Sequence, residues 1–350
     1  PDLFSRVFPA DMRPQAHEII RTWLFSTIVR SELEHHQLPW RHAAISGWIL
    51  DPDRKKMAKS KGNVVVPTEP LERHGTDAVR YWAAAARLGV DTAYDEQQMK
   101  VGRRLAIKIL NVSRFVLTRL AEADAGNGSE PDSTGPSGHV TEAIDAAMLA
   151  SLAAVVSDAT AAFERYDHAR ALELTESFFW TYCDDYVELV KARAYGEATG
   201  SEPATSARLA LELSLSVLLR CFAPFLPYCT EETWSWWHSG SIHRAPWPLT
   251  TELTDVAGAN ARPELLGLVG EVLASIRRTK SEAHRSVRAP VRSCVVTGPP
   301  AAIELLQEAG SDLEQAGTIG ELGFLADDGA TEVTVTIQLG DDPSTESAST

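Results

Sequence analysis

Residues 55–63 read Lys55-Lys56-Met57-Ala58-Lys59-Ser60-Lys61-Gly62-Asn63, and the interpretation of the whole chain depends on this stretch. Four of its nine residues are lysines, in a chain whose formal net charge is −15. Small residues between the lysines let the backbone approach a ligand closely, and clustered ammonium groups suit a triphosphate. Charge alone fits a solvated basic surface loop equally well, so the flanking residues have to decide between the two readings.

The residues around the lysine stretch have the pattern of an α/β ligand site. Residues 43–50 are nearly all apolar and are predicted to form a buried strand, which the turn at residues 51–53 ends. Upstream, prolines 9 and 14 are expected in a loop, followed by a helix from Gln15 that carries Ile19 and Trp23 on one face and Glu18 at its start. A strand that runs into a ligand loop and then a helix is where open α/β sheets place their sites.

Helical periodicity dominates from about residue 96 to residue 237. Before this region, Gly75 is expected to end a short helix, and Thr76 or Asp77 can cap the next one. Four longer helices follow, with a flexible connector between Glu122 and His139 and with Thr230 and Thr233 as possible caps near the end. The apolar positions of the four helices are 101, 105, 109, 112, 116 and 120; 144, 148, 152, 155 or 156, and 163; 172, 178, 179, 182, 186 and 190; and a leucine-rich run from about 206 to 222. Helices of this length in series predict a bundle.

The last part of the chain has a mixed pattern. A helix is predicted through Leu265 and Ile276, then a strand over 293–297, a helix over 301–315 and a half-buried strand over 333–339. The sequence thus predicts a mainly α chain with three domains. These are an α/β domain (1–95), an α-helical bundle (96–248) and a small α+β domain (249–340), followed by a disordered tail (341–350).

Composition excludes several classes of protein. With 350 residues, 44% hydrophobic and 23% charged, the chain has the composition of a soluble globular protein with more than one core. We find no apolar run of the roughly 18 residues that span a membrane, and no signal peptide. The four cysteines show no metal-binding spacing, so we expect a reduced, cytoplasmic protein without a bound metal.

Specific motifs identify a family. Lys56-Met57-Ala58-Lys59-Ser60 resembles the KMSKS signature of class I aminoacyl-tRNA synthetases, and residues 61–65 continue it as in the valine, isoleucine and leucine branch. Three more stretches agree, in the family's order: residues 16–23, 178–186 and 223–234, followed by residues 245–248. The resemblance covers roughly residues 1–248, is strongest to the valyl-tRNA synthetases, and overrules the reading as a solvated loop. It implies that residues 1–95 are the C-terminal half of a Rossmann-type α/β catalytic domain and that residues 96–248 are an α-helical anticodon-binding bundle.

The resemblance implies roles for matching residues. Lys59 would contact ATP, used with Mg²⁺, and stabilise the leaving pyrophosphate as valyl-adenylate forms, with Lys56 and Ser60 assisting. Glu18 would bind the adenylate, together with Lys56 and Met57, and Ile19 and Trp23 would line the valine pocket. The basic residues that we expect to contact tRNA(Val) are Arg103, Arg104, Lys108, Arg277 and Arg278.

Departures from the family pattern qualify the implied activity. Glu18 stands where the family usually has Asp, and Ala58 replaces a Ser, so a decayed, inactive copy is one reading. The H-I-G-H motif, the editing domain and a C-terminal coiled coil are not found in these residues. We therefore expect the C-terminal part of a valine–tRNA ligase, inactive alone and requiring an upstream half. The alternatives are a non-catalytic tRNA-binding fragment or split-enzyme subunit and, less favoured, an isoleucine–tRNA ligase.

Overall fold

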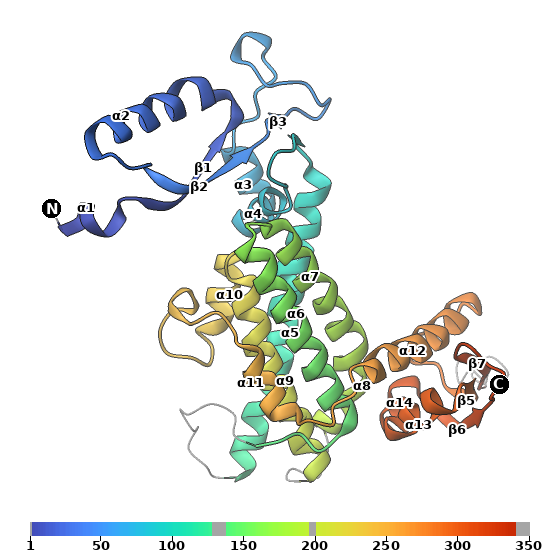
Figure 1. The fold of residues 1–350 in the computed structure, drawn as a ribbon. Helices are drawn as coiled ribbons and strands as arrows, with labels where there is room; N and C mark the ends of the chain where they lie inside the picture. The colour runs from blue at the N-terminus through green and yellow to red at the C-terminus, as the bar shows by residue number, and fades with distance from the viewer. Residues whose placement is uncertain (1, 128–137, 196–200, 341–350) are drawn as a thin grey trace. The chain divides into compact units, whose positions relative to one another are not determined.

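The computed structural model describes residues 2–127, 138–195 and 201–340 (Figure 1). It is mostly helical, as predicted, and its residues cluster into two compact units. The first unit contains Pro1–Lys108, Ala159–Glu173 and Phe225–Cys229, and the second contains Ile109–Asp158, Leu174–Pro224 and Thr230–Thr350. These units interleave along the chain, so the domain limits at 95, 248 and 340 stay predictions. The predicted tail at 341–350 and most of the predicted connector lie outside the described residues.

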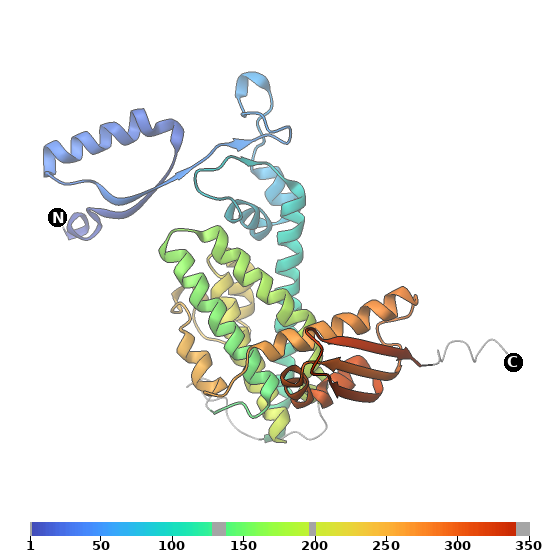
Figure 2. The same ribbon diagram turned by 45° about the vertical axis from the view of Figure 1, so that its right-hand side comes forward.

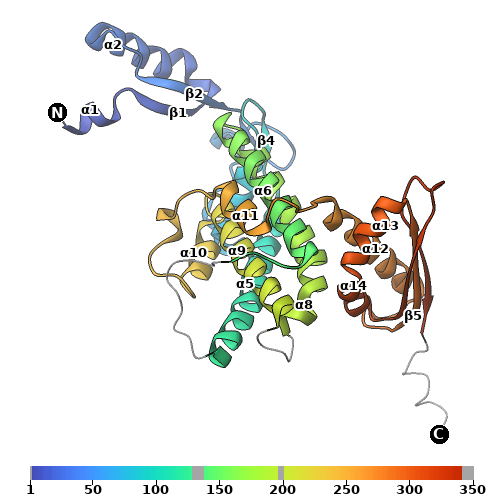
Figure 3. The ribbon, with the colours of Figure 1, turned by 60° about the horizontal axis from the view of Figure 1, so that its bottom comes forward.

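The first unit begins with a β-α-β arrangement. After α1 (Asp2–Val7), strands β1 (Ala10–Ala16) and β2 (Trp40–Ser46) pair in parallel, from Ala10 opposite Trp40 to Ala16 opposite Ser46. The crossover between them runs through η1 (His17–Ile19), η2 (Ile20–Leu24) and α2 (Phe25–His35), which lies beside the strands in Figures 1 and 3. Because the two strands are parallel, their carboxyl ends lie at the same edge of the pair.

Two sequence predictions for this region are wrong. The helix expected from Gln15 starts only after a strand, because residues 10–16 pair with β2, and Pro14 lies within β1 rather than in a loop. The strand expected over 43–50 is half-exposed and breaks at Gly47, where an added Cβ would lie 2.3 Å from the carbonyl oxygen of Val90. Strand β3 then covers only Ile49–Leu50 and pairs in parallel with β4 (Thr92–Ala93).

Asp77 caps a different helix from the one predicted. Helix α3 (Thr68–His74) ends at Gly75 as expected, and α4 (Thr76–Ala84) begins without a side-chain cap. Instead, the buried carboxylate of Asp77 accepts hydrogen bonds from the backbone N–H groups of Tyr228 (3.1 Å) and Cys229 (2.7 Å), in the first turn of α10 (Pro227–Trp234). Thr230 and Thr233 are buried inside α10 and are not caps.

A set of long helices supplies most of the second unit's core. They are α5 (Glu96–Asn127), α6 (Ala143–Glu164), α7 (His168–Thr181), η4 (Tyr182–Tyr186), α8 (Val187–Tyr195) and α9 (Glu202–Phe222), followed by η5 (Ile242–Arg244) and α11 (Thr250–Ala257). The predicted helix faces are confirmed, because Ile109, Met148, Leu152 and Phe179 are buried. The connector predicted from Glu122 starts later, since α5 continues to Asn127.

Helix α6 differs from the expectation that no segment is apolar enough to span a membrane. Within the residues that the structure describes, it is the one helix with the length and mean hydropathy of a membrane span. Its apolar character comes largely from alanines, and Ala147, Met148, Leu149 and Leu152 are fully buried. This burial is typical of a core helix in a bundle.

The last part of the second unit is a three-stranded sheet covered on one face by helices (Figures 2 and 3). Strand β5 (Val291–Gly298) is central, with β6 (Ile319–Ala326) parallel to it and β7 (Thr334–Leu339) antiparallel. The helices are α12 (Glu264–Glu282), α13 (Pro300–Glu308) and α14 (Gly310–Gly317). The sequence prediction missed β6 and merged α13 with α14, which Ala309 separates.

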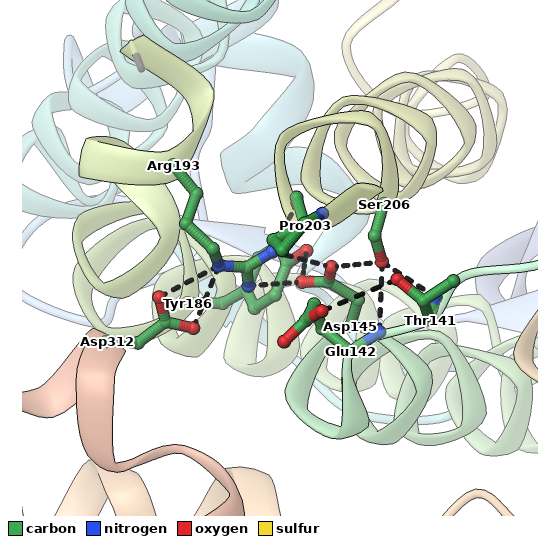
Figure 4. Close-up of polar contacts among 8 residues, drawn as sticks. All are labelled: Thr141, Glu142, Asp145, Tyr186, Arg193, Pro203, Ser206 and Asp312. Atoms are coloured by element: carbon green, nitrogen blue, oxygen red, sulfur yellow. Dashed lines mark hydrogen bonds and ion pairs between the residues drawn. The ribbon is translucent and has the colours of Figure 1, made fainter. Parts of the chain in front are cut away.

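A buried ionic network joins this α+β part to the helices (Figure 4). The carboxylate of Asp145, on α6, accepts hydrogen bonds from the hydroxyls of Tyr186 (2.8 Å) and Ser206 (2.7 Å) and from Nη1 (3.0 Å) and Nη2 (2.9 Å) of Arg193. The Nε of the same guanidinium donates to both carboxylate oxygens of Asp312 on α14, at 2.8 and 3.0 Å. Elements α6, α8, α9 and α14 therefore meet at one charged centre.

Replacing Asp145 by alanine should destabilise the second unit by about 3 kcal/mol or more, because it leaves the buried Arg193 with one carboxylate in place of two. Urea unfolding, followed by near-ultraviolet circular dichroism, measures the change. Asp158→Ala is the matched control, since Asp158 is exposed on the same helix and should change stability by no more than about 0.5 kcal/mol. Equal stabilities of the two variants would contradict a stabilising role for the network.

Candidate functional site

The lysine stretch forms a loop that its two ends hold closed. The carboxylate of Asp51, at the end of β3, accepts hydrogen bonds from the backbone N–H of Lys55 (2.7 Å) and from the side-chain amide of Asn63 (2.7 Å). The same amide of Asn63 donates to the carbonyl oxygen of Lys56 (3.2 Å), and its oxygen accepts from the N–H of Ala58 (2.9 Å). The hydrogen bond from Asn63, together with the N–H of Lys55, holds the pKa of Asp51 below its usual range. The ionised carboxylate of Asp51 and the side-chain amide of Asn63 thus hold the two ends of the loop together.

Lys56 is brought directly to Glu18. Its ammonium donates a hydrogen bond to Oε1 of Glu18 and lies 4.3 Å from the centre of the Trp48 ring. This hydrogen bond, with the charge of Lys56, holds the pKa of Glu18 below its ordinary value. The ring of His17 lies 4.7 Å from that of Trp48, and its Nδ1 is 3.2 Å from the carbonyl oxygen of Ser46. An ionised carboxylate, a cation and two aromatic rings therefore share the edge where β1 and β2 end.

Lys59 and Ser60 lie apart from this cluster, in the exposed turn η3 (Lys59–Lys61). Gly62 follows the turn with φ of 66°, a conformation that favours glycine. In the part of the chain that the structure describes, neither Lys59 nor Lys61 makes an ion pair with a carboxylate. The ammonium of Lys59 is therefore available to an anion from solution, whereas that of Lys56 already has a partner.

The residues expected in a valine pocket are close to the surface. Trp23 is 39% exposed, stacks on Trp40 with ring centres 5.7 Å apart, and has the guanidinium of Arg13 4.0 Å from its ring. Ile19 is half-buried at the end of η1, and Met57 is half-buried in the lysine loop. Ile19 and Trp23 thus follow Glu18 in the crossover, in η1 and η2 respectively.

The basic residues expected to contact RNA differ in their availability. Arg103 and Arg104 are exposed on α5, although Nη1 of Arg103 donates to the carbonyl oxygen of Arg73 (3.0 Å). Lys108 is half-buried. Arg277 is bound to the carboxylate of Asp185 (2.8 Å), while Arg278 is exposed. Arg277 is thus committed to an ion pair within the fold, whereas Arg278 is exposed.

Sequence reasoning missed four residues of this site: Asp51, Asn63, Trp48 and His17. Asp51 and Asn63 bracket the lysine stretch, and a polar pair at the two ends of a loop is the signal that could have found them. Trp48 and His17 belong to stretches that looked like a buried strand and a helix, so their meeting at a strand edge was hidden. The replacement at Ala58 removes a hydroxyl, but the backbone N–H of Ala58 still holds the loop through Asn63.

Two models of known protein families match the chain. Residues 2–95 match the model of the family "tRNA synthetases class I (I, L, M and V)", and residues 145–295 match that of the "Anticodon-binding domain of tRNA ligase". A leucyl-tRNA synthetase from Agrobacterium radiobacter, solved in a ternary complex with tRNA, has a similar fold, with a TM-score of 0.54 and 20% identity over 80% of this chain and 37% of that one. The Mycobacterium tuberculosis methionyl-tRNA synthetase has a TM-score of 0.52 and 20% identity, over 74% of this chain and 48% of that one.

The chain belongs to the class I tRNA synthetases. Its curated relatives include the valine–tRNA ligase of Thermobifida fusca, 56% identical over 97% of this chain, and that of Leifsonia xyli, 52% identical over 93%. Within the class, the sequence therefore groups with the valine–tRNA ligases. The chain spans just over a third of the length of these relatives, 37% and 36% respectively.

Replacing Asn63 by alanine should open the lysine loop. The change removes the hydrogen bonds to Asp51, Ala58 and Lys56, and a net loss of about 1.4 kcal/mol of local stability corresponds to about tenfold faster opening. Limited trypsin digestion, with mass spectrometry of cleavage after residues 56, 59 and 61, measures this. Val64→Ala, at an exposed neighbour, is the control, and cleavage of the Asn63 variant at the control's rate would contradict the role of Asn63.

Proposed function

We propose that the chain is part of a valine–tRNA ligase, which activates valine with MgATP and transfers it to tRNA(Val). The observation that carries this proposal is the lysine loop itself. It is a KMSKS-type loop closed at the carboxyl end of a parallel strand pair, in a chain 56% identical to a valine–tRNA ligase. Lys56 is paired with Glu18, and Lys59 makes no ion pair with any carboxylate that the structure describes. A cytoplasmic location, where tRNA is charged, is part of the same proposal.

Lys59 is the residue proposed to act on ATP. Valyl-adenylate forms when the valine carboxylate attacks the α-phosphorus and pyrophosphate leaves with its negative charge. The exposed ammonium of Lys59, on a turn next to glycine, can follow that charge as it develops, and the hydroxyl of Ser60 can donate beside it. Positioning and charge suffice here, since displacement at phosphorus asks little covalent chemistry of the protein.

Lys56 and Glu18 are proposed to form the adenylate-binding half of the site, with Met57 beside them. Because Lys56 lowers the pKa of Glu18, the carboxylate is ionised at neutral pH and can accept hydrogen bonds from ribose hydroxyls. The ion pair between the two is exposed, so a triphosphate can draw Lys56 away at little cost. Ile19 and Trp23, which follow Glu18 in the chain, are proposed to form an apolar wall of the valine pocket.

Binding of tRNA is proposed for the helical part of the chain. The support is the match of residues 145–295 to an anticodon-binding domain and the exposure of Arg103 and Arg104 on α5. Both arginines are long, charged donors suited to phosphate oxygens. Lys108 and Arg278 are also proposed to contact tRNA. Arg277 is assigned a structural role instead, because its guanidinium is bound to the carboxylate of Asp185.

Catalysis is proposed to require further polypeptide packed on the first unit. Large apolar side chains are exposed there, including Leu3 (69%), Phe25 (62%), Leu33 (74%) and Leu38 (56%). An exposed apolar surface of this kind is typical of one that docks against another protein segment. A chain that spans 37% of its relative leaves ample sequence for such a partner segment.

Replacing Lys59 by alanine should lower valine-dependent ATP–pyrophosphate exchange by about 10²–10³-fold, as for other residues that stabilise charge in a transition state. The assay uses this chain together with the upstream part of the Thermobifida fusca relative, as a covalent fusion or as two polypeptides. Lys61→Ala, two residues away on the same turn, is the matched control and should retain most of the exchange.

Three results would count against the proposal. Equal exchange by the Lys59 variant and the parent would remove Lys59 from the reaction. Exchange that depends on isoleucine instead of valine would assign the other member of the branch. Absence of exchange in every assembled form, with tRNA binding retained, would favour a non-catalytic tRNA-binding protein. The ion pair of Lys56 with Glu18 is compatible with that alternative, because each residue then has a partner without a bound nucleotide.

A further inference from the structure

A second cationic segment lies far from the lysine loop in the sequence. Residues 277–292 contain five arginines and one lysine but a single carboxylate, that of Glu282, in a chain of net charge −15. They form the end of α12, the loop 283–290 and the start of β5. We call residues 283–290, with Arg278 before them and Arg292 after them, the arginine loop.

Two of the six cations are used to build the fold. Arg277 donates to the carboxylate of Asp185 (2.8 Å) and to the carbonyl oxygen of Asp184, which joins α12 to η4. Lys280 is only 2% exposed, and its ammonium donates to the carbonyl oxygens of Val287 and Gly317, each at 2.9 Å. Burying a cation against backbone carbonyls costs free energy, which indicates that Lys280 has a structural role.

The position of Lys280 explains the shape of the loop. The carbonyl oxygen of Lys280 accepts from the N–H of Arg285 (2.8 Å), while its ammonium holds Val287 from the other side. His284 takes φ of 55°, which turns the chain back at the end of the helix. As a result Val287 is 71% exposed, and Arg288 next to it is exposed as well. The loop is therefore a held structure that presents its tip to solvent.

The other arginines of the segment face outward. Arg278, Arg288 and Arg292 are exposed, and none makes an ion pair with a carboxylate in the described ranges 2–127, 138–195 and 201–340. Arg285 is half-buried and donates to the carbonyl oxygen of Gly340 (3.4 Å). Three guanidinium groups thus remain for an external anion.

We propose that the arginine loop binds the phosphate backbone of RNA. Guanidinium groups make forked hydrogen bonds to phosphate oxygens, and three of them within 15 residues of chain suit successive phosphates of a strand better than a single small anion. The loop lies within residues 145–295, which match an anticodon-binding domain. Apart from His284, the loop has no aromatic side chain on which a base could stack, so the contact proposed for its arginines is with the backbone and independent of base sequence.

This inference rests on the proposed function, because it takes tRNA as the RNA in question. Lys280 is then a positioning residue: it touches no RNA but holds the backbone that carries Arg285 and Arg288. The ionic contact of Arg277 with Asp185 and that of Asp312 with Arg193 fix the same α+β part on the helices of the second unit. The loop is thereby held at a constant place relative to those helices.

The test compares RNA binding by the 350-residue chain and its variants. Labelled transcripts of a valine tRNA and of a tRNA of another specificity are titrated between 50 and 300 mM KCl. The variant Arg278→Gln/Arg288→Gln/Arg292→Gln loses three phosphate contacts, so the slope of log K against log [KCl] should fall by about 3 for both RNAs. Lys280→Met should lower the slope as well, although it removes no exposed charge.

A matched control separates the loop from overall charge. Arg6→Gln/Arg30→Gln/Arg41→Gln changes the net charge equally at exposed positions of the first unit and should keep the parent slope. Thermal unfolding of each variant shows that the fold is retained. Equal slopes for parent, loop variant and control would overturn the arginine loop while leaving tRNA binding intact. Failure of the parent chain to bind either tRNA would overturn the tRNA-binding part of the proposed function, and the inference with it.

Discussion

The second unit depends on one guanidinium, that of Arg193, which lies between two buried carboxylates. Removing charges from water is expensive, and the geometry here repays that cost through hydrogen bonds to Asp145 and Asp312 and to the hydroxyl-bearing neighbours of Asp145. An apolar contact between helices tolerates small shifts of one helix along the other. Hydrogen bonds are directional, so this network fixes the positions of α6, α8 and α14 relative to one another. This network, together with the ion pair of Arg277 with Asp185, positions the α+β part on the helices of the second unit.

The lysine loop follows the opposite physical logic. Its hydrogen bonds join the buried carboxylate of Asp51, as acceptor, to Lys55 and Asn63 of the same loop, and the ion pair of Lys56 with Glu18 is exposed. An exposed ion pair contributes little stability, so Lys56 can easily exchange Glu18 for another partner. A loop that grips a triphosphate has to change partners during a reaction, and weak closure suits that task. A rigid scaffold with a lightly held loop is the general design of catalytic sites on strand edges.

Sequence patterns predicted what depends on neighbours along the chain. The faces of α5 and α6, the end of α3 at Gly75 and the lysine loop all follow from local spacing. The errors arise where distant segments decide. Residues 10–16 form a strand because they pair with β2, which is 30 residues further along the chain. The strand predicted over 43–50 ends at Gly47, where the backbone of Val90 lies close. Asp77 caps α10, about 150 residues downstream. In the candidate site, Glu18 and Lys56 were identified singly, but their pairing, and the parts of Trp48 and Asn63, required the tertiary structure.

The same distinction applies to charge. In the sequence, Arg277, Arg278 and Lys280 look equivalent. In the structure, Arg277 binds the carboxylate of Asp185, Lys280 donates to two backbone carbonyl oxygens, and Arg278 is exposed to solvent. A negatively charged protein can still bind RNA if its free cations are concentrated in a few places, because screening confines each to about 10 Å at 0.1 M salt. Phosphate contacts of this kind set orientation and affinity. In the proposed tRNA complex, discrimination among tRNAs would therefore come from base contacts elsewhere on the molecule.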